Sequence, residues 1–138
     1  MADEAKEVAF PKLPKGAGKI DEKAAKTFTT TDSGLKYRIL RAGAGAKPTA
    51  RQTVKVNYHG WLNSGKVFDS SYERNEAISF PLNRVIAGWT EGMQLVGKGG
   101  MIELDIPSKL AYDSQGGSPP DIKVGDNLHF LVELIDVK

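Results

Sequence analysis

Apolar and polar side chains alternate along three short stretches of the chain, at residues 35–39, 54–59 and 102–106. A period of two is typical of a strand that has one face buried and the other in water. A fourth stretch, LHFLVELIDV at residues 128–137, is apolar on both faces, as expected for a central strand covered on each side. Together with a short extended segment at residues 67–68, these stretches predict a mainly antiparallel sheet.

Residues 83–97 depart from this period and predict one short helix. Asn83 is the candidate N-cap and Gly97 the candidate residue just beyond the helix end. Within the helix, Gly88 and Gly92 each cost roughly 1 kcal/mol relative to alanine. We therefore expect a close approach of the helix to the strands to compensate. Four apolar residues recur at helical spacing: Ile86, Trp89, Met93 and Val96.

Length and composition fit one compact domain preceded by a tail. The chain has 138 residues, of which 40% are hydrophobic, which is enough for one core but not comfortably for two. Residues 1–30 show no sustained period and are predicted to be a flexible tail, so that residues 31–138 form the domain. No apolar run in the tail suits a signal peptide or a spanning helix. We expect a soluble monomer, either cytoplasmic or exported with its leader removed.

The residue inventory excludes several kinds of chemistry. With no cysteine, the chain has neither disulfides nor thiolate or zinc-thiolate sites. A formal charge of +2 is too balanced to predict nucleic acid or an anionic membrane as a partner. His59 and His129 are far apart in sequence, which disfavours a metal site. Residues 97–100 lack the ending of a phosphate-binding loop, and no nucleophile elbow is present. We therefore expect no metal and no cofactor.

Four segments occur in the order and spacing of a known family: VNYHGWLNSGKVFDSSYERN, VIAGWTEGM, LAYD and LHFLVELIDV. The chain resembles the FKBP-type prolyl isomerases over nearly all of residues 35–138. The resemblance implies an α+β fold, in which a strongly curved antiparallel β-sheet of five or six strands wraps around one short α-helix. It also implies a hydrophobic pocket between the sheet and the helix.

The resemblance further implies the residues of that pocket. Trp89 matches the pocket floor, the Ile86 backbone N–H is expected to bind a substrate carbonyl, and Tyr112 is expected to donate its hydroxyl from an overhanging loop. Asp69 matches an aspartate beside the pocket, with Arg74 as its ionic partner. The implied catalytic residues are Tyr58, Phe68, Asp69, Trp89, Tyr112 and Phe130. The implied substrate-binding residues are Arg74, Ile78, Val85, Ile86 and Ile122.

Three features depart from the family pattern. Ile78 stands where many relatives have an aromatic edge, and Asp113 replaces the glycine that commonly follows the loop tyrosine. The Pro-Pro pair falls at residues 119–120 rather than just after Ile122. Ile78 offers less surface and no ring, while the other two changes alter the loop at residues 112–127 and so bear on sequence preference and macrolide affinity.

The function implied by the resemblance is peptidyl-prolyl cis-trans isomerisation, a reaction that needs no cofactor. Its implied partners are proline-containing polypeptides in unfolded or flexible chains, together with immunosuppressive macrolides. An alternative stays open, namely a non-catalytic peptide-binding or chaperone module that uses the same pocket only to hold partners. Taken singly, such aromatic residues are more often plain core residues, and an Asp–Arg pair is more often a surface ion pair worth about 0–1 kcal/mol. Their occurrence together at family spacing favours activity, whereas Ile78 and the altered loop favour the module.

Overall fold

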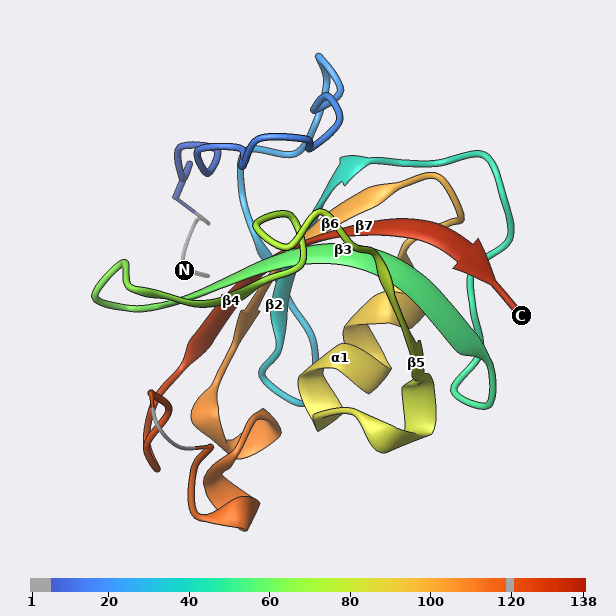
Figure 1. The fold of residues 1–138 in the computed structure, drawn as a ribbon. Coiled ribbons are helices and arrows are strands. Elements are labelled where there is room, and N and C mark those ends of the chain that lie inside the picture. The colour runs from blue at the N-terminus through green and yellow to red at the C-terminus, as the bar shows by residue number, and fades with distance from the viewer. Residues whose placement is uncertain (1–5, 119–120) are drawn as a thin grey trace.

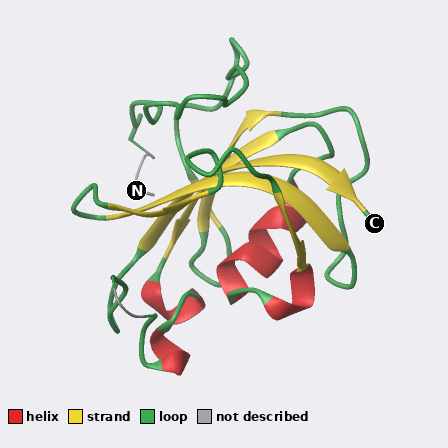
Figure 2. Ribbon diagram, in the orientation of Figure 1, coloured by secondary structure: helices red, strands yellow, loops and turns green. Residues whose placement is uncertain are grey.

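One antiparallel sheet bends around a short helix in the computed structural model, which describes residues 6–118 and 121–138 (Figures 1 and 2). The strands are β1 (Thr29–Thr30), β2 (Lys36–Arg41), β3 (Thr53–Leu62), β4 (Val67–Ser70), β5 (Ile78–Pro81), β6 (Met101–Ile106) and β7 (Leu128–Val137). They lie in the order β1-β2-β6-β7-β3-β4, and β5 pairs with β3 beside β4. The predicted class, a curved antiparallel sheet around one helix, is confirmed.

The sheet has seven strands rather than the five or six that were predicted. The prediction missed β1 and β5, which have two and four residues and are too short for a period of two to be recognised. Both gain their structure from a neighbour, because β1 pairs with β2 and β5 pairs with β3. Tertiary pairing therefore supplies what the local pattern lacks.

The long strands β3 and β7 form the centre of the sheet. They pair from Val54 and Val137 at one end to Leu62 and Leu128 at the other, and β6 flanks β7 on its other side. Side chains of β7 are buried on both faces, since Val132 belongs to the main core whereas Leu131 belongs to a second cluster on the opposite face. The prediction of a doubly covered strand is confirmed. We call the face that carries the helix the inner face and the opposite one the outer face.

The predicted helix is divided into three turns: η1 (Leu82–Arg84), α1 (Ala87–Gly92) and η2 (Met93–Leu95). The assignment of Asn83 as N-cap is wrong, because Asn83 lies in the 3-10 turn η1 and Ile86 caps α1. The extended backbone of Val85, with φ −111° and ψ 175°, separates the two turns. Gly97 does follow the end of η2, and a β-carbon there would lie 2.6 Å from the Gly45 carbonyl oxygen.

The two glycines of α1 allow the helix to touch the sheet directly. A β-carbon at Gly88 would lie 2.5 Å from the Ile106 side chain, and one at Gly92 would lie 2.6 Å from that of Leu104. Ile106 and Leu104 belong to β6 and are fully buried. The expected close approach of the helix to the strands is confirmed.

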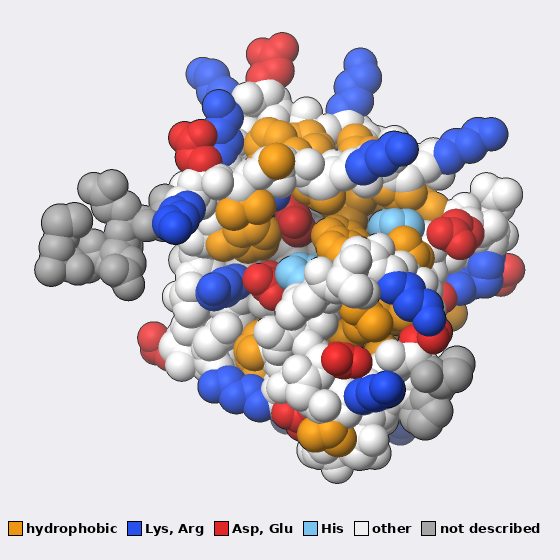
Figure 3. All heavy atoms as spheres, turned by 90° about the vertical axis from the view of Figure 1, so that its left-hand side faces the viewer, with side chains coloured by type: hydrophobic (Ala, Val, Ile, Leu, Met, Phe, Trp, Pro, Cys, Tyr) orange, Lys and Arg blue, Asp and Glu red, His pale blue; other side chains and the backbone are white. Residues whose placement is uncertain are grey.

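The segment before β1 lies across the outer face, where Figure 3 shows hydrophobic side chains gathered between charged ones. The side chains it places against the sheet pack on Leu40, Met101 and Leu131, with Trp61 beside them. These packing residues are Phe10, Leu13, Ile20 and Ala24. A division at residue 31 and a flexible tail stay predictions, but in this structure residues 8–28 follow the sheet as an arm.

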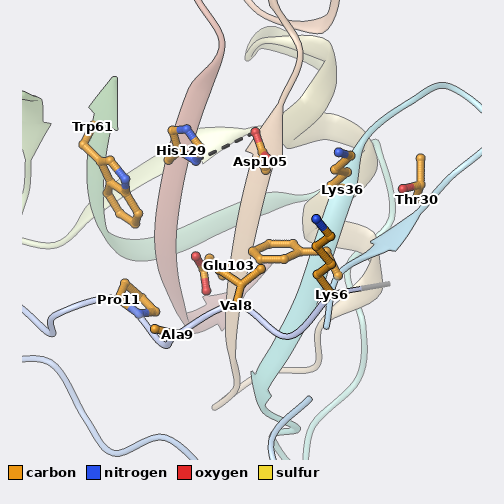
Figure 4. A pocket seen from close by; sticks show the side chains of 11 residues that line it. Lys6, Val8, Ala9, Pro11, Thr30, Lys36, Trp61, Glu103, Asp105 and His129 are labelled. Carbon is orange, nitrogen blue, oxygen red and sulfur yellow. Dashed lines mark ion pairs between the residues drawn. The ribbon is translucent and has the colours of Figure 1, made fainter. Parts of the chain in front are cut away.

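Arg38 of β2 binds this arm through hydrogen bonds and ring contacts. Its side chain is fully buried and donates from Nε to the Glu103 carboxylate at 2.7 Å. The Phe10 and Phe28 rings lie 4.9 and 4.5 Å from the guanidinium carbon. Figure 4 shows Val8 and Ala9 of the arm next to Glu103. The guanidinium also donates to three arm carbonyl oxygens, those of Val8, Ala9 and Lys26, at 2.7, 2.9 and 3.1 Å.

Replacing Arg38 should therefore destabilise the whole domain. Arg38→Met leaves the Glu103 carboxylate buried without its cation, a change that typically costs roughly 3–5 kcal/mol. We expect the free energy of unfolding from urea titration to fall by that amount. The control is Arg51→Met, which alters an exposed arginine and should change stability by less than about 0.5 kcal/mol. Equal losses in the two variants would contradict the role given to Arg38.

Candidate functional site

A pocket of about 160 Å³ opens between the inner face of the sheet and the turns around α1. Its floor and walls come from β3, β4, β5, α1 and β7 and from the two residues between η1 and α1, with one further residue from the loop that follows β6. The lining residues are Tyr58, Phe68, Asp69, Phe80, Val85, Ile86, Trp89, Tyr112 and Phe130.

Trp89 stands at the centre of an aromatic cluster. The side chain is 4% exposed, and the rings of Tyr58, Phe80 and Phe130 lie 5.5, 5.6 and 5.3 Å from its own, each close to perpendicular to it. Edge-to-face contacts of this kind favour one fixed arrangement of the rings. The buried indole N–H has no hydrogen-bond partner among the described residues.

The lack of a side chain at Gly60 allows the Phe68 and Phe130 rings to pack against the strand. Gly60 pairs with Phe130 on one side and Asp69 on the other, so it lies in the strand immediately beneath the pocket wall. A β-carbon at Gly60 would be 2.6 Å from the Phe68 ring and 2.9 Å from the Phe130 ring. The Phe68 and Phe130 rings meet edge to face at 5.4 Å. Any larger residue at position 60 would force the two rings apart.

Polar groups occupy one edge of the pocket. The Tyr58 hydroxyl donates to the Asp69 carboxylate, and the Arg74 guanidinium donates both to Asp69 and, at 3.2 Å, to the Tyr58 oxygen. Partial burial alone would raise the pKa of Asp69, but the hydrogen bonds from Tyr58 and Arg74 outweigh it and hold that pKa below its ordinary value. Burial, together with the bond to Asp69, raises the pKa of Tyr58 to about 12. Near neutral pH the carboxyl is therefore ionised and the phenol protonated.

Two residues that line the pocket carry a hydrogen-bond donor without a partner among the described residues. Within the described part of the chain, neither the Ile86 backbone N–H nor the Tyr112 hydroxyl has an acceptor. Ile86 caps α1, so its N–H belongs to the unpaired donors of a helix start. Tyr112 reaches the pocket from the loop between η3 (Ser108–Leu110) and η4 (Asp113–Gln115). The pocket is thus apolar with these two donors among its lining residues.

The structure brings most of the predicted site residues together. All six predicted catalytic residues line the pocket, as do Val85 and Ile86. Arg74 lies behind Asp69 rather than on the pocket surface, and Ile122 is buried in the core at 6% exposure. The predicted pocket contact of Ile78 is not seen, because its side chain is 36% exposed on β5 and Phe80, two residues further on, lines the pocket instead.

Sequence reasoning missed Phe80 and Gly60. Ile78 and Phe80 stand two residues apart, so that a strand there would place both on one face, but three alternating residues are too few to predict that strand. Gly60 carried a signal, since a glycine inside a strand pattern suggests the close approach of another group. Neither position could be tied to the pocket before the pairings of β3 were known.

A larger cavity of about 730 Å³ lies on the outer face, between the arm and the sheet (Figure 4). Its lining mixes charged side chains such as Lys36 and Asp105 with Trp61 and His129, whose rings stack 5.7 Å apart. No group of three or more potential metal ligands occurs in residues 6–118 and 121–138. Across the same residues, no helix has the length and apolar character needed to cross a membrane. Because the inner pocket brings together the aromatic rings around Trp89 and the hydrogen-bonded Tyr58–Asp69 edge, we take it as the candidate site.

Comparison with known proteins gives the family. The model of the FKBP-type peptidyl-prolyl cis-trans isomerases matches residues 45–135. FkpA of Escherichia coli K12, named an FKBP-type peptidyl-prolyl cis-trans isomerase, is 50% identical over 117 residues, which are 85% of this chain and 42% of that protein. The chain thus spans less than half the length of this relative.

Solved structures agree with this result. The crystal structure of Escherichia coli FkpA matches with a TM-score of 0.76 and 49% identity over 80% of this chain and 51% of that one. A peptidyl-prolyl cis-trans isomerase from Pseudomonas syringae pv. tomato str. DC3000 matches with a TM-score of 0.75 and 37% identity over 85% of both chains. From the matched family model, these identities and the shared fold, we conclude that the chain belongs to the FKBP-type peptidyl-prolyl cis-trans isomerase family.

Proposed function

We propose that this chain catalyses the cis-trans isomerisation of Xaa-Pro peptide bonds in unfolded or flexible polypeptides and so assists their folding. The observation that carries the proposal is the aromatic pocket built around Trp89, which is lined by rings and by the two residues that carry these donors. The Pseudomonas syringae protein supports it, because that protein is named for this reaction and the chain spans 85% of its length.

The reaction suits a site without a nucleophile or a metal. Rotation about a peptide C–N bond faces a barrier of about 18–20 kcal/mol, because twisting removes amide resonance. The planar amide has more charge separation than the twisted one, so water stabilises the ground state more than the transition state. A pocket of rings around Trp89 and Phe130 removes that preference by excluding water. Each 1.4 kcal/mol removed from the barrier accelerates exchange about tenfold.

The polar groups of the site are proposed to orient the substrate chain. The Ile86 N–H and the Tyr112 hydroxyl would each donate to a substrate carbonyl and hold the bound segment in place. Asp69 is better placed as an electrostatic organiser than as a general base, because no proton moves in the reaction. Its bonds to Tyr58 and Arg74 fix the edge of the pocket in one arrangement.

The partners proposed for this pocket are proline-containing polypeptides and immunosuppressive macrolides. A monomer is the proposed oligomeric state. Residues 31–138 are the proposed functional unit. The arm packs on the outer face, away from the rings that would meet the substrate.

Exchange spectroscopy by NMR on a short peptide with leucine before proline tests the proposal. The wild-type chain should accelerate cis-trans exchange, while Phe68→Ala and Trp89→Leu, which open the pocket to water, should slow it at least about tenfold. Trp61→Ala is the matched control, since Trp61 lies on the same strand but packs on the outer face. Peptide binding by the wild-type chain without faster exchange would instead establish a non-catalytic binding module.

The pH profile gives a second test. Because Asp69 keeps a lowered pKa and that of Tyr58 is raised to about 12, neither should titrate between about pH 6 and 8. We expect kcat/KM to be flat across this interval. Because the fold lowers the pKa of Asp69, the bonds of its ionised carboxylate stabilise the folded chain fully above the ordinary carboxyl pKa. This stabilisation is lost as the pH falls through the lowered pKa. A bell-shaped profile centred near pH 7 would show that a group titrating there takes part in the reaction.

A further inference from the structure

Asp113 has contacts that a glycine at this position could not make. It opens η4 directly after Tyr112, at the position where the sequence departs from the family's usual glycine. Its carboxylate accepts a hydrogen bond from the Ser108 hydroxyl at 2.8 Å and another from the Gly125 backbone N–H at 2.8 Å. One oxygen atom takes each bond, so the carboxylate joins two separate segments of the chain.

These two segments are the beginning and the end of the long loop. Ser108 starts η3, two residues after β6 ends at Ile106, and Gly125 lies three residues before β7 begins at Leu128. A third bond closes the same base, because the Ser108 N–H donates to the Asn127 side chain at 2.9 Å. The side chains of Asp113 and Asn127 thus join the two ends of the loop, which we call its neck.

The closed neck carries Tyr112. Its backbone, with φ −107° and ψ 9°, adopts a sparsely populated conformation, and its carbonyl oxygen accepts from the N–H groups of Gln115 and Gly117 at 3.0 and 2.9 Å. Its ring lines the pocket, while its hydroxyl has no acceptor in the described part of the chain. Tyr112 thus projects from a backbone whose two flanking segments are joined by the bonds of Asp113.

We propose that Asp113 is a positioning residue, which fixes the Tyr112 loop over the pocket before a peptide arrives and so sets the affinity for it. The inference rests on the proposed function of the pocket. A mobile loop would have to become ordered when the peptide binds. The free-energy cost of that ordering would weaken binding. An orientation that is equally useful to the planar and the twisted peptide bond changes KM and leaves kcat nearly unaltered.

The experiment measures exchange kinetics of the same leucine-proline peptide with a set of variants. Asp113→Ala removes both hydrogen bonds and should raise KM about five- to tenfold with less than a twofold change in kcat. Asp113→Asn keeps an acceptor for the Gly125 N–H and can donate to the Ser108 oxygen, so it should restore KM to within about twofold of wild type. Asp126→Ala is the matched control, because among the described residues the Asp126 carboxylate accepts a hydrogen bond only from the Lys123 N–H of its own turn.

A double-mutant cycle with Tyr112→Phe separates positioning from general stability. If Asp113 acts through the tyrosine hydroxyl, Asp113→Ala should raise KM less than about twofold in the Tyr112→Phe background. Equal effects in both backgrounds would overturn the inference, and so would an unchanged KM for Asp113→Ala in an otherwise active chain. A wild-type chain that does not accelerate exchange overturns the proposed function instead. Peptide titration by NMR then gives Kd for the same variants and tests the positioning role by the same ratios.

Discussion

The contact between α1 and β6 determines where the pocket can form. Gly88 and Gly92 together cost roughly 2 kcal/mol of helix propensity. In return, Leu104 and Ile106 become fully buried against the helix, and each such burial contributes about 1.5–3 kcal/mol. With an alanine at either position the β-carbon would overlap a sheet side chain, so the helix would move outward. Trp89 projects from the same helix, α1, and its position among the rings depends on the short distance between α1 and β6.

A second glycine completes the arrangement from the side of the sheet. Gly60 lies between the partners Phe130 and Asp69, and the absence of a side chain there lets two phenyl rings meet over the strand. The pocket is therefore enclosed by rings and at the same time left open in the middle. The rings that pack around Trp89 enclose a pocket of about 160 Å³.

Local patterns in the sequence predicted the elements that have a clear period. The alternation at residues 102–106 and the doubly apolar stretch at residues 128–137 became β6 and β7, and the helical spacing around Trp89 became α1. Resemblance to a known family placed the six predicted catalytic residues, all of which line the pocket. What could not be predicted arises from partners that are distant in sequence.

Three residues show why the distant contacts escaped prediction. Arg38 alternates with Tyr37 and Ile39 like any exposed strand residue, yet it is fully buried because the arm returns across it. Asp113 sits in a polar loop, and only the meeting of the loop's two ends reveals its two bonds. Ile78 lies in a strand too short to show a period, so its orientation was open until β5 paired with β3.

The Arg38–Glu103 pair is buried whereas the Asp69–Arg74 pair is partly exposed, and this difference explains their different roles. Burial raises the pKa of Glu103 despite the attraction of Arg38, so this pair gains little net free energy over an apolar contact of the same shape. The pair instead fixes the position of the arm, because Arg38 donates to three arm carbonyl oxygens. Asp69 is half-buried and has a lowered pKa, since Tyr58 and Arg74 stabilise the charged form. For a reaction in which no proton moves, a carboxylate that stays ionised through neutral pH is a fixed part of the pocket edge, and it can orient Tyr58 without exchanging a proton with solvent.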